Sequence, residues 1–534
     1  MNILKNTAAG LGAAALALML GASARAANVV NFAAAGSSAQ FSTFTQAFLD
    51  QGYTNHYSLS SSSSFQIVDP SAPNESAQVA IYWQGSPGNY QIAVFYQVDS
   101  TVGVRAFFNN DTLTAPASIT LEPATSTRMN NVGQPGSGDV APPAEVLAAV
   151  NGFAVNVGAT DITPEDARVA TERTINLGYN NTGNPVKGAT NSGVATPVRF
   201  NLASKPFSLV PLGAVPIVVF INNGPSFGAI GMGGTNPPAY NLNIDSFTLA
   251  GFLSGQFNRT SDLILAQSAN TNPNPVHVYV REPLSGTYNT MEYTNPESLA
   301  KLRFTNGRQS GSILASGGQE LNVSATANNP LNEPVGGAPN GVPGAGRIRA
   351  IGTGQLVGAA NRDTVDALGY AFYSAGTFTN LKDTSNPPVV IPTVLRYLTV
   401  DGADPIQDNY TGGSLTGATV TFRNIRNGGY PLWSILRVVE PQNAPNTITN
   451  IVTQAQNENN GTDFVTFQSL RVFRSYHQTP FTLPAPGQTG LGTPSNGNNG
   501  TPAKGGDVGG AVFSINNDVD NFNDFGGELT NQRQ

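Results

Sequence analysis

Residues 29–49 read Val-Val-Asn-Phe-Ala-Ala-Ala-Gly-Ser-Ser-Ala-Gln-Phe-Ser-Thr-Phe-Thr-Gln-Ala-Phe-Leu. The stretch from Val29 to Phe32 is short and apolar, which predicts a β-strand. From Gln40 to Leu49 the apolar side chains recur every three or four residues, the spacing of a helix that buries one face. Gly-Ser-Ser at 36–38 lies between the two segments. This part of the chain therefore predicts a unit of strand, glycine-containing turn and helix.

Three later stretches have a similar form, in which small polar or charged residues separate a strand from a helix. The predicted strands 90–98, 153–157 and 276–280 are followed by Asp99-Ser100-Thr101, by Gly158-Ala159-Thr160-Asp161 and by Arg281 with Ser285-Gly286-Thr287. Helices are expected over 102–108, from about Pro164, and over about 290–299. This alternation predicts an α/β fold with a largely parallel, doubly wound sheet. Such sheets bind ligands at the carboxyl ends of strands near helix N-termini, so a binding site is expected in these turns.

The rest of the chain supplies further elements separated by polar stretches. Strands are expected over 209–221, as a strand pair or a crossover, and over 367–372, 394–398 and 432–438. Helices are expected over 143–150, 244–257, 440–451 and 463–476. The stretches 54–88, 109–150 and 174–200 are interpreted as insertions, with 54–78 as an irregular loop and 325–346 as a further loop. Residues 484–534 are rich in Gly, Asn and Asp, which predicts a low-complexity, disordered tail.

Composition limits the classes of function. The 534-residue chain has no cysteine, which excludes disulfides, thiolate metal sites and a lipid-bearing cysteine. Charged residues make up only 11% of the chain and the formal net charge is −7, unlike the basic surface of a nucleic-acid-binding protein. The three histidines, His56, His277 and His477, are far apart in the sequence and lack metal-ligand spacing. No metal, other cofactor or nucleic-acid partner is therefore expected.

The N-terminus has the features of a secretory signal peptide. Residues 1–26 contain Lys5, an apolar run from about Ala8 to Ala22, and the small-x-small sequence Ala-Arg-Ala at 24–26. The alternative is a membrane anchor, but the run is short for a span and rich in Ala and Gly. We therefore expect cleavage near Ala26 and a periplasmic or secreted chain that is not anchored in a membrane.

The turns after the predicted strands resemble those of the periplasmic phosphate-binding proteins of ABC importers. Gly36-Ser37-Ser38-Ala39-Gln40-Phe41 is similar to the family's Gly-Ala-Gly-Ala-Thr-Phe, and Asp99-Ser100-Thr101-Val102-Gly103-Val104 to its Gly-Ser-Ser-Gly-Gly-Val. Val157-Gly158-Ala159-Thr160-Asp161 resembles Phe-Gly-Ala-Ser-Asp, and Arg281-Glu282-Pro283-Leu284-Ser285-Gly286-Thr287 resembles Arg-x-Asp-Gly-Ser-Gly-Thr, both without a gap. Weaker matches are Ala367-Leu368-Gly369-Tyr370 and Tyr430-Pro431-Leu432. The resemblance covers about residues 28–440, interrupted by the three insertions.

The resemblance implies a two-lobed fold of the type 2 periplasmic-binding-protein class, with doubly wound, mostly parallel sheets, a hinge and a central cleft. Lobe 1 would comprise residues 27–205 and lobe 2 residues 206–345, while residues 346–483 would return to lobe 1 and add C-terminal elements. The implied activity is non-catalytic binding of inorganic phosphate or a related oxyanion, for uptake through an ABC importer permease. The implied ligand-binding residues are Gln40, Phe41, Ser100, Thr101, Asp161, Arg281, Ser285, Gly286 and Thr287.

The chemistry of these residue types suits an oxyanion. Helix N-termini offer unpaired N–H groups and a partial positive charge. The hydroxyls of Ser100, Ser285 and Thr287 are donors, and the planar guanidinium of Arg281 can hold two oxygens. A carboxylate such as Asp161 repels an anion unless the anion has a proton to donate, which phosphate has at neutral pH and sulfate lacks. Local roles remain open, with Ser100 and Asp161 as helix N-caps and Arg281 as a surface ion pair.

Six positions depart from the family's pattern, two of them being Glu282 and Leu284, which together with Pro283 replace a flexible turn. Gln40 is longer than the family's Thr, and Asp99 adds a negative charge close to the expected anion. Val102 replaces a glycine, and Pro283 removes one backbone donor. These departures predict a site that is weakened, retuned toward another protonated oxyanion or a phosphorylated compound, or lost.

Two other functions remain open. The insertions and tail, rich in Asn, Gly, Ser and Thr, favour an envelope or extracellular interaction protein that reuses the fold without transport. A secreted phosphatase or other enzyme is the least favoured, because the sequence has no visible nucleophile–base pair or metal cluster. The leading prediction is an exported solute-binding protein for a protonated oxyanion, with phosphate as the first candidate.

Overall fold

The fold is described from a computed structural model. It describes residues 27–68, 75–121, 139–164, 167–168, 200–222, 224–227, 243–254, 257, 259–263, 274–281, 285–294, 331–334, 346–350, 353–373, 395–407, 420–458, 464–470, 472–474 and 512–514. The predicted signal peptide and most of the segments 174–200, 325–346 and 484–534 lie outside the described residues. Within the described part of the chain, no helix is both long enough and apolar enough to cross a membrane.

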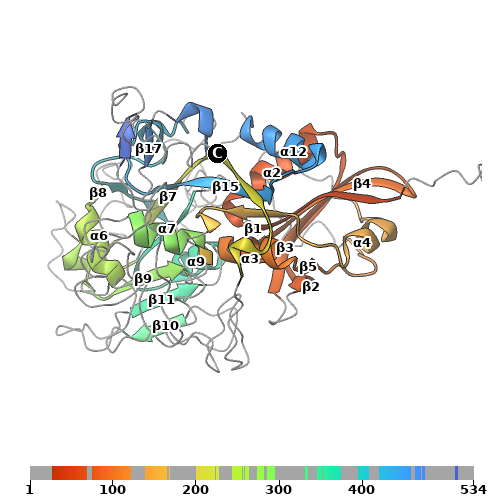
Figure 1. Cartoon of the computed structure of the whole chain (residues 1–534). Coiled ribbons are helices and arrows are strands. Elements are labelled where there is room, and N and C mark those ends of the chain that lie inside the picture. The colour runs from red at the N-terminus through yellow and green to blue at the C-terminus, as the bar shows by residue number, and fades with distance from the viewer. Residues whose placement is uncertain are drawn as a thin grey trace, which may run out of the picture.

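A mixed sheet of 14 strands forms the centre of the described molecule (Figure 1). Its order is β10-β11-β9-β12-β7-β15-β6-β1-β4-β3-β2-β5, with β13 and β16 both paired to β7. The strands are β1 (Val29–Ser37), β2 (Asn55–Val68), β3 (Glu75–Ser86), β4 (Asn89–Val98), β5 (Thr112–Leu113), β6 (Val157–Thr160), β7 (Phe207–Ile221), β9 (Val276–Arg281), β10 (Leu331–Pro334), β11 (Gly346–Ala350), β12 (Asp366–Phe372), β13 (Arg396–Tyr397), β15 (Trp433–Pro441) and β16 (Val465–Thr466). Two small sheets pair β8 (Asn243–Ile244) with β14 (Thr399–Val400), and β17 (Val472–Arg474) with β18 (Val512–Ser514).

Helices pack against this sheet and position the turns at the strand ends. Among them, α3 contacts β1 and β6, α7 contacts β9 and β15, and α12 packs on α2. The sheet is covered by α2 (Phe41–Asp50), α3 (Ser100–Asn109), α4 (Ala144–Val150), α6 (Ser246–Ser254), α7 (Gly286–Thr294), α9 (Thr353–Arg362), α11 (Arg423–Arg426) and α12 (Asn446–Gln456). The strand–turn–helix units predicted at 29–49 and 90–108 are confirmed in β1–α2 and β4–α3.

Strand β7 joins the two ends of the sheet. Residues 207–216 of β7 pair with β15, whereas residues 217–221 pair with β12. The change of partner falls at Pro216, which has no N–H to donate and is followed by Ile217, whose N–H donates to the carbonyl of Leu432 over 2.8 Å. The apolar run at 209–221 is thus a single long strand, and the prediction of a strand pair or crossover is wrong.

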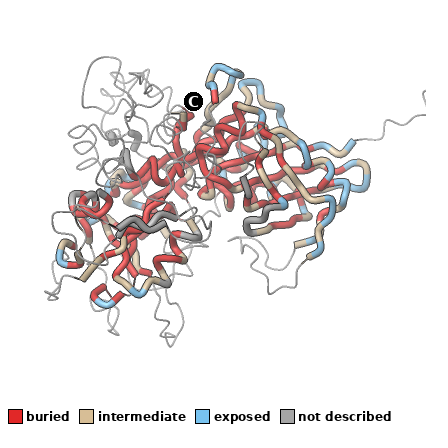
Figure 2. The backbone as a smooth tube through the Cα atoms, turned by 90° about the horizontal axis from the view of Figure 1, so that it is seen from below, coloured by how far each residue is buried: buried red, intermediate tan, exposed pale blue. Residues whose placement is uncertain are grey.

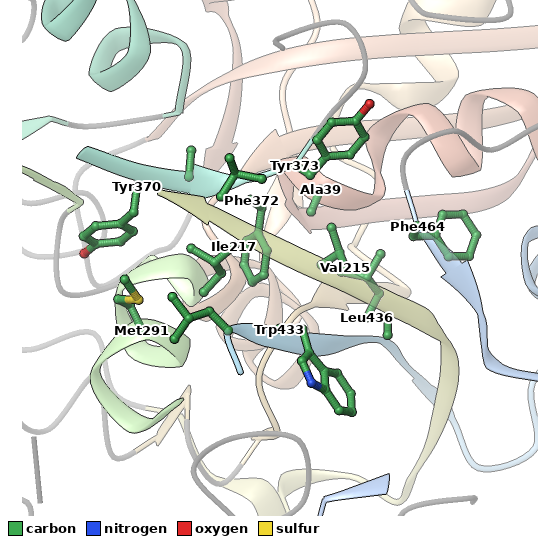
Figure 3. Close-up of a cluster of buried hydrophobic side chains, with 14 of the residues drawn as sticks. Ala39, Val215, Ile217, Met291, Tyr370, Phe372, Tyr373, Trp433, Leu436 and Phe464 are labelled. Atoms are coloured by element: carbon green, nitrogen blue, oxygen red, sulfur yellow. The ribbon is translucent and has the colours of Figure 1, made fainter. Parts of the chain in front are cut away.

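The hydrophobic core is continuous along the sheet. The largest cluster of buried side chains includes Phe32 and Phe95 from one end of the sheet and Val278 and Leu368 from the other. Figure 2 shows that buried residues run through the interior on both sides of the molecule, whereas exposed residues lie at its periphery. Around the change of partner in β7, Figure 3 shows further members of this cluster, namely Val215, Ile217, Tyr370, Phe372, Trp433 and Leu436. Burial of an aromatic side chain such as Trp433 is a large contribution to folding, on the order of 3 kcal/mol.

Three further predicted features differ from the structure. The polar stretch 54–78 is not an irregular loop, because most of it forms the antiparallel strands β2 and β3, whose backbone groups pair with each other. The sheet is mixed instead of mostly parallel, since β2, β3 and β4 form an antiparallel meander and β7 and β15 run antiparallel. The segment 463–476 contains β16, a 3-10 turn and β17 where a helix was expected. The α/β class itself is confirmed.

Candidate functional site

The turns singled out in the sequence meet at one place in the fold. Strands β4, β1 and β6 are adjacent and parallel, so their carboxyl ends lie at the same edge of the sheet. Helix α3 begins at Ser100, directly after β4, and Asp161 directly follows β6. From the other end of the sheet come Arg281, the last residue of β9, and the start of α7 at Gly286.

Two close approaches establish that these segments touch. A Cβ atom added to Gly286 would lie 2.4 Å from Ser100 Oγ and 2.5 Å from Asp161 Oδ1. Only a glycine leaves room for the first turn of α7 to approach these two side chains this closely. Within the same edge, Gly103 lets α3 lie directly on β1, because its Cβ would be 2.2 Å from the Ala35 carbonyl oxygen.

Asp161 is the central carboxyl group of the site. Its side chain is 1% exposed and accepts hydrogen bonds from the hydroxyls of Ser100 and Ser37. Its backbone carbonyl accepts a further hydrogen bond from the hydroxyl of Ser434 on β15. Burial raises the pKa of Asp161 to about 7, because a charged carboxylate loses its hydration there, while the Ser37 hydrogen bond and Arg281 act in the opposite direction. The Asp161 carboxyl group can therefore donate or accept a proton near neutral pH.

Arg281 supplies the positive charge and is 2% exposed. One terminal nitrogen of its guanidinium, Nη2, donates to Asp99 Oδ1 over 2.8 Å. The other, Nη1, donates to the hydroxyl of Thr353 over 2.6 Å, at the first residue of α9. The alternative of a surface ion pair for Arg281 is wrong, because the pair that it makes is buried.

We call Ser37, Asp99, Ser100, Asp161 and Arg281 the Asp161–Arg281 cluster. The predicted residues Thr101, Ser285 and Thr287 are also buried beside it, at the first turns of α3 and α7. The Thr101 hydroxyl is buried and has no hydrogen-bond partner among the described residues. Ser100 is the first residue of α3, but its hydroxyl donates to Asp161, so the structure gives it a role other than the capping that was left open. The helix that Asp161 was expected to cap lies partly outside the described residues.

Gln40 and Phe41 lie next to the cluster in roles of their own. The side-chain amide of Gln40 donates to the carbonyls of Thr160 over 2.7 Å and Arg437 over 2.9 Å, so it ties β6 to β15. The ring of Phe41 packs edge-on against Phe95 in the core, and its N–H donates within the 3-10 turn before α2. Their donor groups are thus engaged within the protein.

Sequence reasoning did not single out three members of the site. Ser37 is the last residue of β1, in the Gly-Ser-Ser turn. Like Ser100 after β4, it is a hydroxyl residue at the carboxyl end of a strand, and this position could have identified it. Asp99 was noted only as an added negative charge, and Thr353 was not noted. Asp99 is 182 residues away from Arg281 in the sequence, so their pairing depends on tertiary packing that no local pattern reveals.

Comparisons with known proteins add little to this geometry. No protein-family model matches the chain, and no curated protein matches it either. Five chains of solved structure match. One is an ABC-type phosphate transport receptor from Vibrio cholerae, with 13% sequence identity and a TM-score of 0.24, covering 48% of this chain and 71% of the receptor. A likeness at this TM-score is too weak to assign a ligand, so the residues of the site must carry the functional argument.

Proposed function

We propose that this chain is an exported solute-binding protein that takes a small protonated oxyanion, with phosphate as the first candidate, into a cleft between two lobes. The observation that carries the proposal is the Asp161–Arg281 cluster. A guanidinium, a carboxyl group and a hydroxyl from three separate strand ends converge there, and each side chain is at most 2% exposed. Burying such groups together is costly for a fold, which favours a binding role for them.

The donors of the cluster suit an oxyanion. Arg281 can hold two oxygens of a tetrahedral anion through its planar fork. Helices α3 and α7 both begin at the cluster, and the first turn of a helix has backbone N–H groups without an intrahelical partner and carries a partial positive charge. The Thr101 hydroxyl, which has no partner in the described part of the chain, is a further donor for a ligand.

Asp161 gives the proposal its specificity. A carboxylate beside an anion is repulsive unless a proton lies between them. Phosphate and arsenate bring a hydroxyl that can donate to Asp161, whereas sulfate at neutral pH brings none. We therefore expect the site to bind phosphate in preference to sulfate.

Binding in this proposal requires the two ends of the sheet to separate and close around the ligand. Gly286 packs directly on Ser100 and Asp161, so the anion would enter between α7 and the turns after β4 and β6. Strands β7 and β15 are the route by which such a hinge would act, because β7 pairs with both ends of the sheet. Delivery of the bound anion to an ABC importer permease completes the proposed function.

Calorimetry of the purified chain with phosphate, arsenate, sulfate and molybdate tests the proposal. We expect 1:1 binding of phosphate and arsenate and none of sulfate. Arg281→Met and Asp161→Asn should lose the phosphate heat, while Asp50→Asn, at an exposed carboxylate on α2, should keep it. Absence of heat and of any rise in thermal midpoint at millimolar phosphate would disprove the proposal, and so would equal binding of sulfate.

Export is a separate part of the proposal with its own test. We propose cleavage near Ala26 and release into the periplasm or the medium. N-terminal sequencing of the chain recovered from fractionated cells should begin close to Ala27, and a chain that keeps residues 1–26 in a cytoplasmic fraction would contradict this.

One observation favours a second function, that of an envelope or extracellular interaction protein without transport. Asp99 already pairs with Arg281, and Ser100 already donates to Asp161, so the polar groups of the cluster satisfy one another without a ligand. A silent ligand screen, together with a pull-down that recovers an envelope partner and no importer subunit, would favour this function over anion uptake.

A further inference from the structure

The second carboxyl group of the cluster, Asp99, has a position that helix capping does not explain. Asp99 is the N-cap residue of α3, a place where Asp normally accepts a backbone N–H of the first turn. Its side chain makes no such capping hydrogen bond. Instead its carboxylate turns to Arg281, with 2.8 Å between Oδ1 and Nη2, and the residue is 5% exposed. Asp99 therefore belongs to the charge arrangement of the site and not to the helix end.

Among the described residues, Arg281 from β9 and Asp161 from the end of β6 are charged groups that face Asp99. Two carboxyl groups thus share one guanidinium in a buried region, where charges interact strongly. With both carboxylates ionised, the cluster itself has a net charge of −1. A doubly charged anion entering this place would find one positive charge already paired and two negative charges beside it.

We infer that Asp99 makes the site select the singly charged, doubly protonated form of its oxyanion, such as dihydrogen phosphate or dihydrogen arsenate, over the dianion. This inference rests on the proposed function of the site. In the bound state one ligand hydroxyl donates to Asp161 and a second donates to Asp99, while the other two oxygens accept from Arg281 and the helix N-termini. Removal of Asp99 leaves Asp161 as the one carboxylate of the cluster beside the guanidinium, which lowers the negative charge of the cluster and lets the dianion bind.

Proton uptake during binding distinguishes the two forms. At mildly alkaline pH free phosphate is almost entirely dianionic, because it loses its second proton near neutrality. Selection of the monoanion therefore requires the complex to take up about one proton from the buffer, and the affinity should fall about tenfold for each pH unit. Binding of the dianion takes up no proton and is independent of pH in this range.

The experiment is titration calorimetry of the wild-type chain and Asp99→Asn with phosphate. The titrations are run between about pH 8 and pH 9, in two buffers of different ionisation enthalpy, from which the number of protons taken up is obtained. We expect about one proton and a tenfold fall per pH unit for wild type, and no proton and a flat affinity for Asp99→Asn. Asp50→Asn, which removes an exposed carboxylate at the last residue of α2, should match wild type.

The outcomes separate this inference from the function on which it rests. If wild type binds phosphate without proton uptake, the selection by Asp99 is wrong while phosphate binding stands. If Asp99→Asn binds with the same uptake as wild type, the role of Asp99 is likewise wrong. If neither chain binds phosphate, both the inference and the proposed function fail. A wild-type chain that binds phosphate without proton uptake rules out the monoanion by itself, so the inference can be overturned without relying on the folding of the variant.

Discussion

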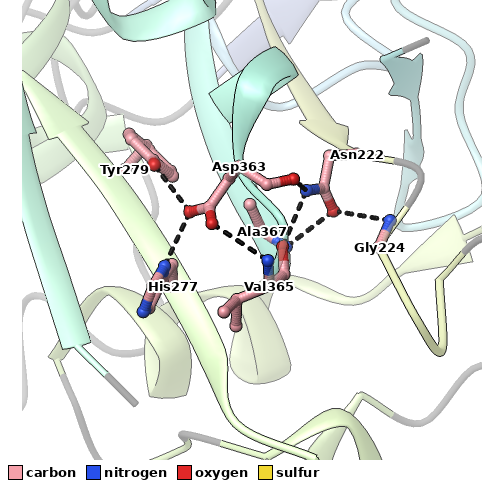
Figure 4. A network of polar contacts seen from close by, with 7 residues as sticks. All are labelled: Asn222, Gly224, His277, Tyr279, Asp363, Val365 and Ala367. Atoms are coloured by element: carbon pink, nitrogen blue, oxygen red, sulfur yellow. Dashed lines mark hydrogen bonds and ion pairs between the residues drawn. The ribbon is translucent and has the colours of Figure 1, made fainter. Parts of the chain in front are cut away.

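Strand β9 carries near each end a side chain that pairs with an aspartate, and the two ends differ in where that aspartate lies in the fold. Arg281 is the last residue of β9 and pairs with Asp99 from the far end of the sheet. His277 is the second residue, and its Nδ1 lies 2.6 Å from Asp363 Oδ2 (Figure 4). Alternate residues of a strand share a face, so His277, Tyr279 and Arg281 lie in one row, with about 13 Å of strand between the first and the last.

The carboxylate of Asp363 accepts hydrogen bonds from residues on its own segment and on the adjacent strand β9. Besides His277, the hydroxyl of Tyr279 donates to its Oδ2 over 2.6 Å and the N–H of Val365 to its Oδ1 over 3.0 Å. Asn222, at the end of β7, donates to the backbone carbonyls of Asp363 and Val365, over 3.2 and 2.7 Å. It accepts from the N–H groups of Gly224 and Ala367, as Figure 4 shows. We call these residues the Asn222–Asp363 network.

The contrast is between a network that stabilises one part of the fold and a cluster at a junction. The Asn222–Asp363 network joins β7, β9 and the start of β12, which are neighbours in the sheet. The Asp161–Arg281 cluster joins β9 to β4 and β6, which lie on the opposite side of β7 and β15. The pKa values of Asp161 and Asp363 also differ between the two regions. Burial opposes ionisation of Asp363, but hydrogen bonds from His277 and Tyr279 lower its pKa, whereas burial raises that of Asp161. The two regions thus differ in which form of the carboxyl group they stabilise, the ionised form at Asp363 and the protonated form at Asp161.

The largest effect should come from removing the one cation of the junction. Arg281→Ala leaves Asp99 and Asp161 buried without their positive partner, which should lower the free energy of unfolding by about 3–5 kcal/mol. Adding Asp99→Asn to this variant removes one uncompensated charge and should recover part of the loss. Urea unfolding of the three chains measures both changes. An Arg281→Ala chain as stable as wild type would mean that the cluster is hydrated and not a buried junction.

The second effect is a dependence of stability on pH that belongs to Asp161. Its pKa in the fold, about 7, lies above the ordinary value of 3.8. The folded chain therefore holds a proton that the unfolded chain releases, so this contribution is present at low pH and is lost as pH rises toward 7. Between about pH 5 and pH 8 the stability of wild type relative to Asp161→Asn should fall by about 3 kcal/mol.

Asp363 provides the contrast for this pH experiment. Its pKa is lowered, so its contribution is present above the ordinary value and is lost only as pH falls through the lowered value. Asp363→Asn should therefore run parallel to wild type between the same two pH values. A parallel course for Asp161→Asn as well would remove the electrostatic difference between the two regions.

The sequence allowed the parts of the junction to be predicted but not how they pair. The turns after β1, β4, β6 and β9 were found because glycine, hydroxyl and acidic residues follow short apolar runs, which are local signals. The ion pair of Arg281 with Asp99 was missed because it forms only when the two ends of the sheet meet. Strand β2 was missed because its serine run has low strand propensity, and its pairing with β3 overrides that preference. The apolar run at 209–221 does not reveal by itself that one strand changes partner at Pro216.

A third effect should come from the contact between α7 and the turns that follow β4 and β6. Gly286→Ala places a methyl group 2.4–2.5 Å from Ser100 Oγ and Asp161 Oδ1, which forces these elements apart and should lower stability by about 2 kcal/mol. The matched control is Gly429→Ala, where the added Cβ meets only the Asn424 side chain at 3.3 Å. Thermal unfolding of the two variants makes the comparison, and equal midpoints would show that α7 does not press on the cluster.

The smallest effect should come from Tyr279→Phe, which removes a single hydroxyl from the Asn222–Asp363 network. Asp363 keeps His277 and the Val365 N–H, so the loss of stability should be about 1 kcal/mol. Tyr279 nevertheless shares a face of β9 with Arg281, two residues away, so it is the residue best placed to connect the two regions. If the regions are independent, the rise in thermal midpoint caused by phosphate should be the same in Tyr279→Phe and wild type. A reduced rise would mean that the row of side chains on β9 transmits the state of one region to the other. The fold-stabilising network and the proposed binding junction would then form a single coupled system.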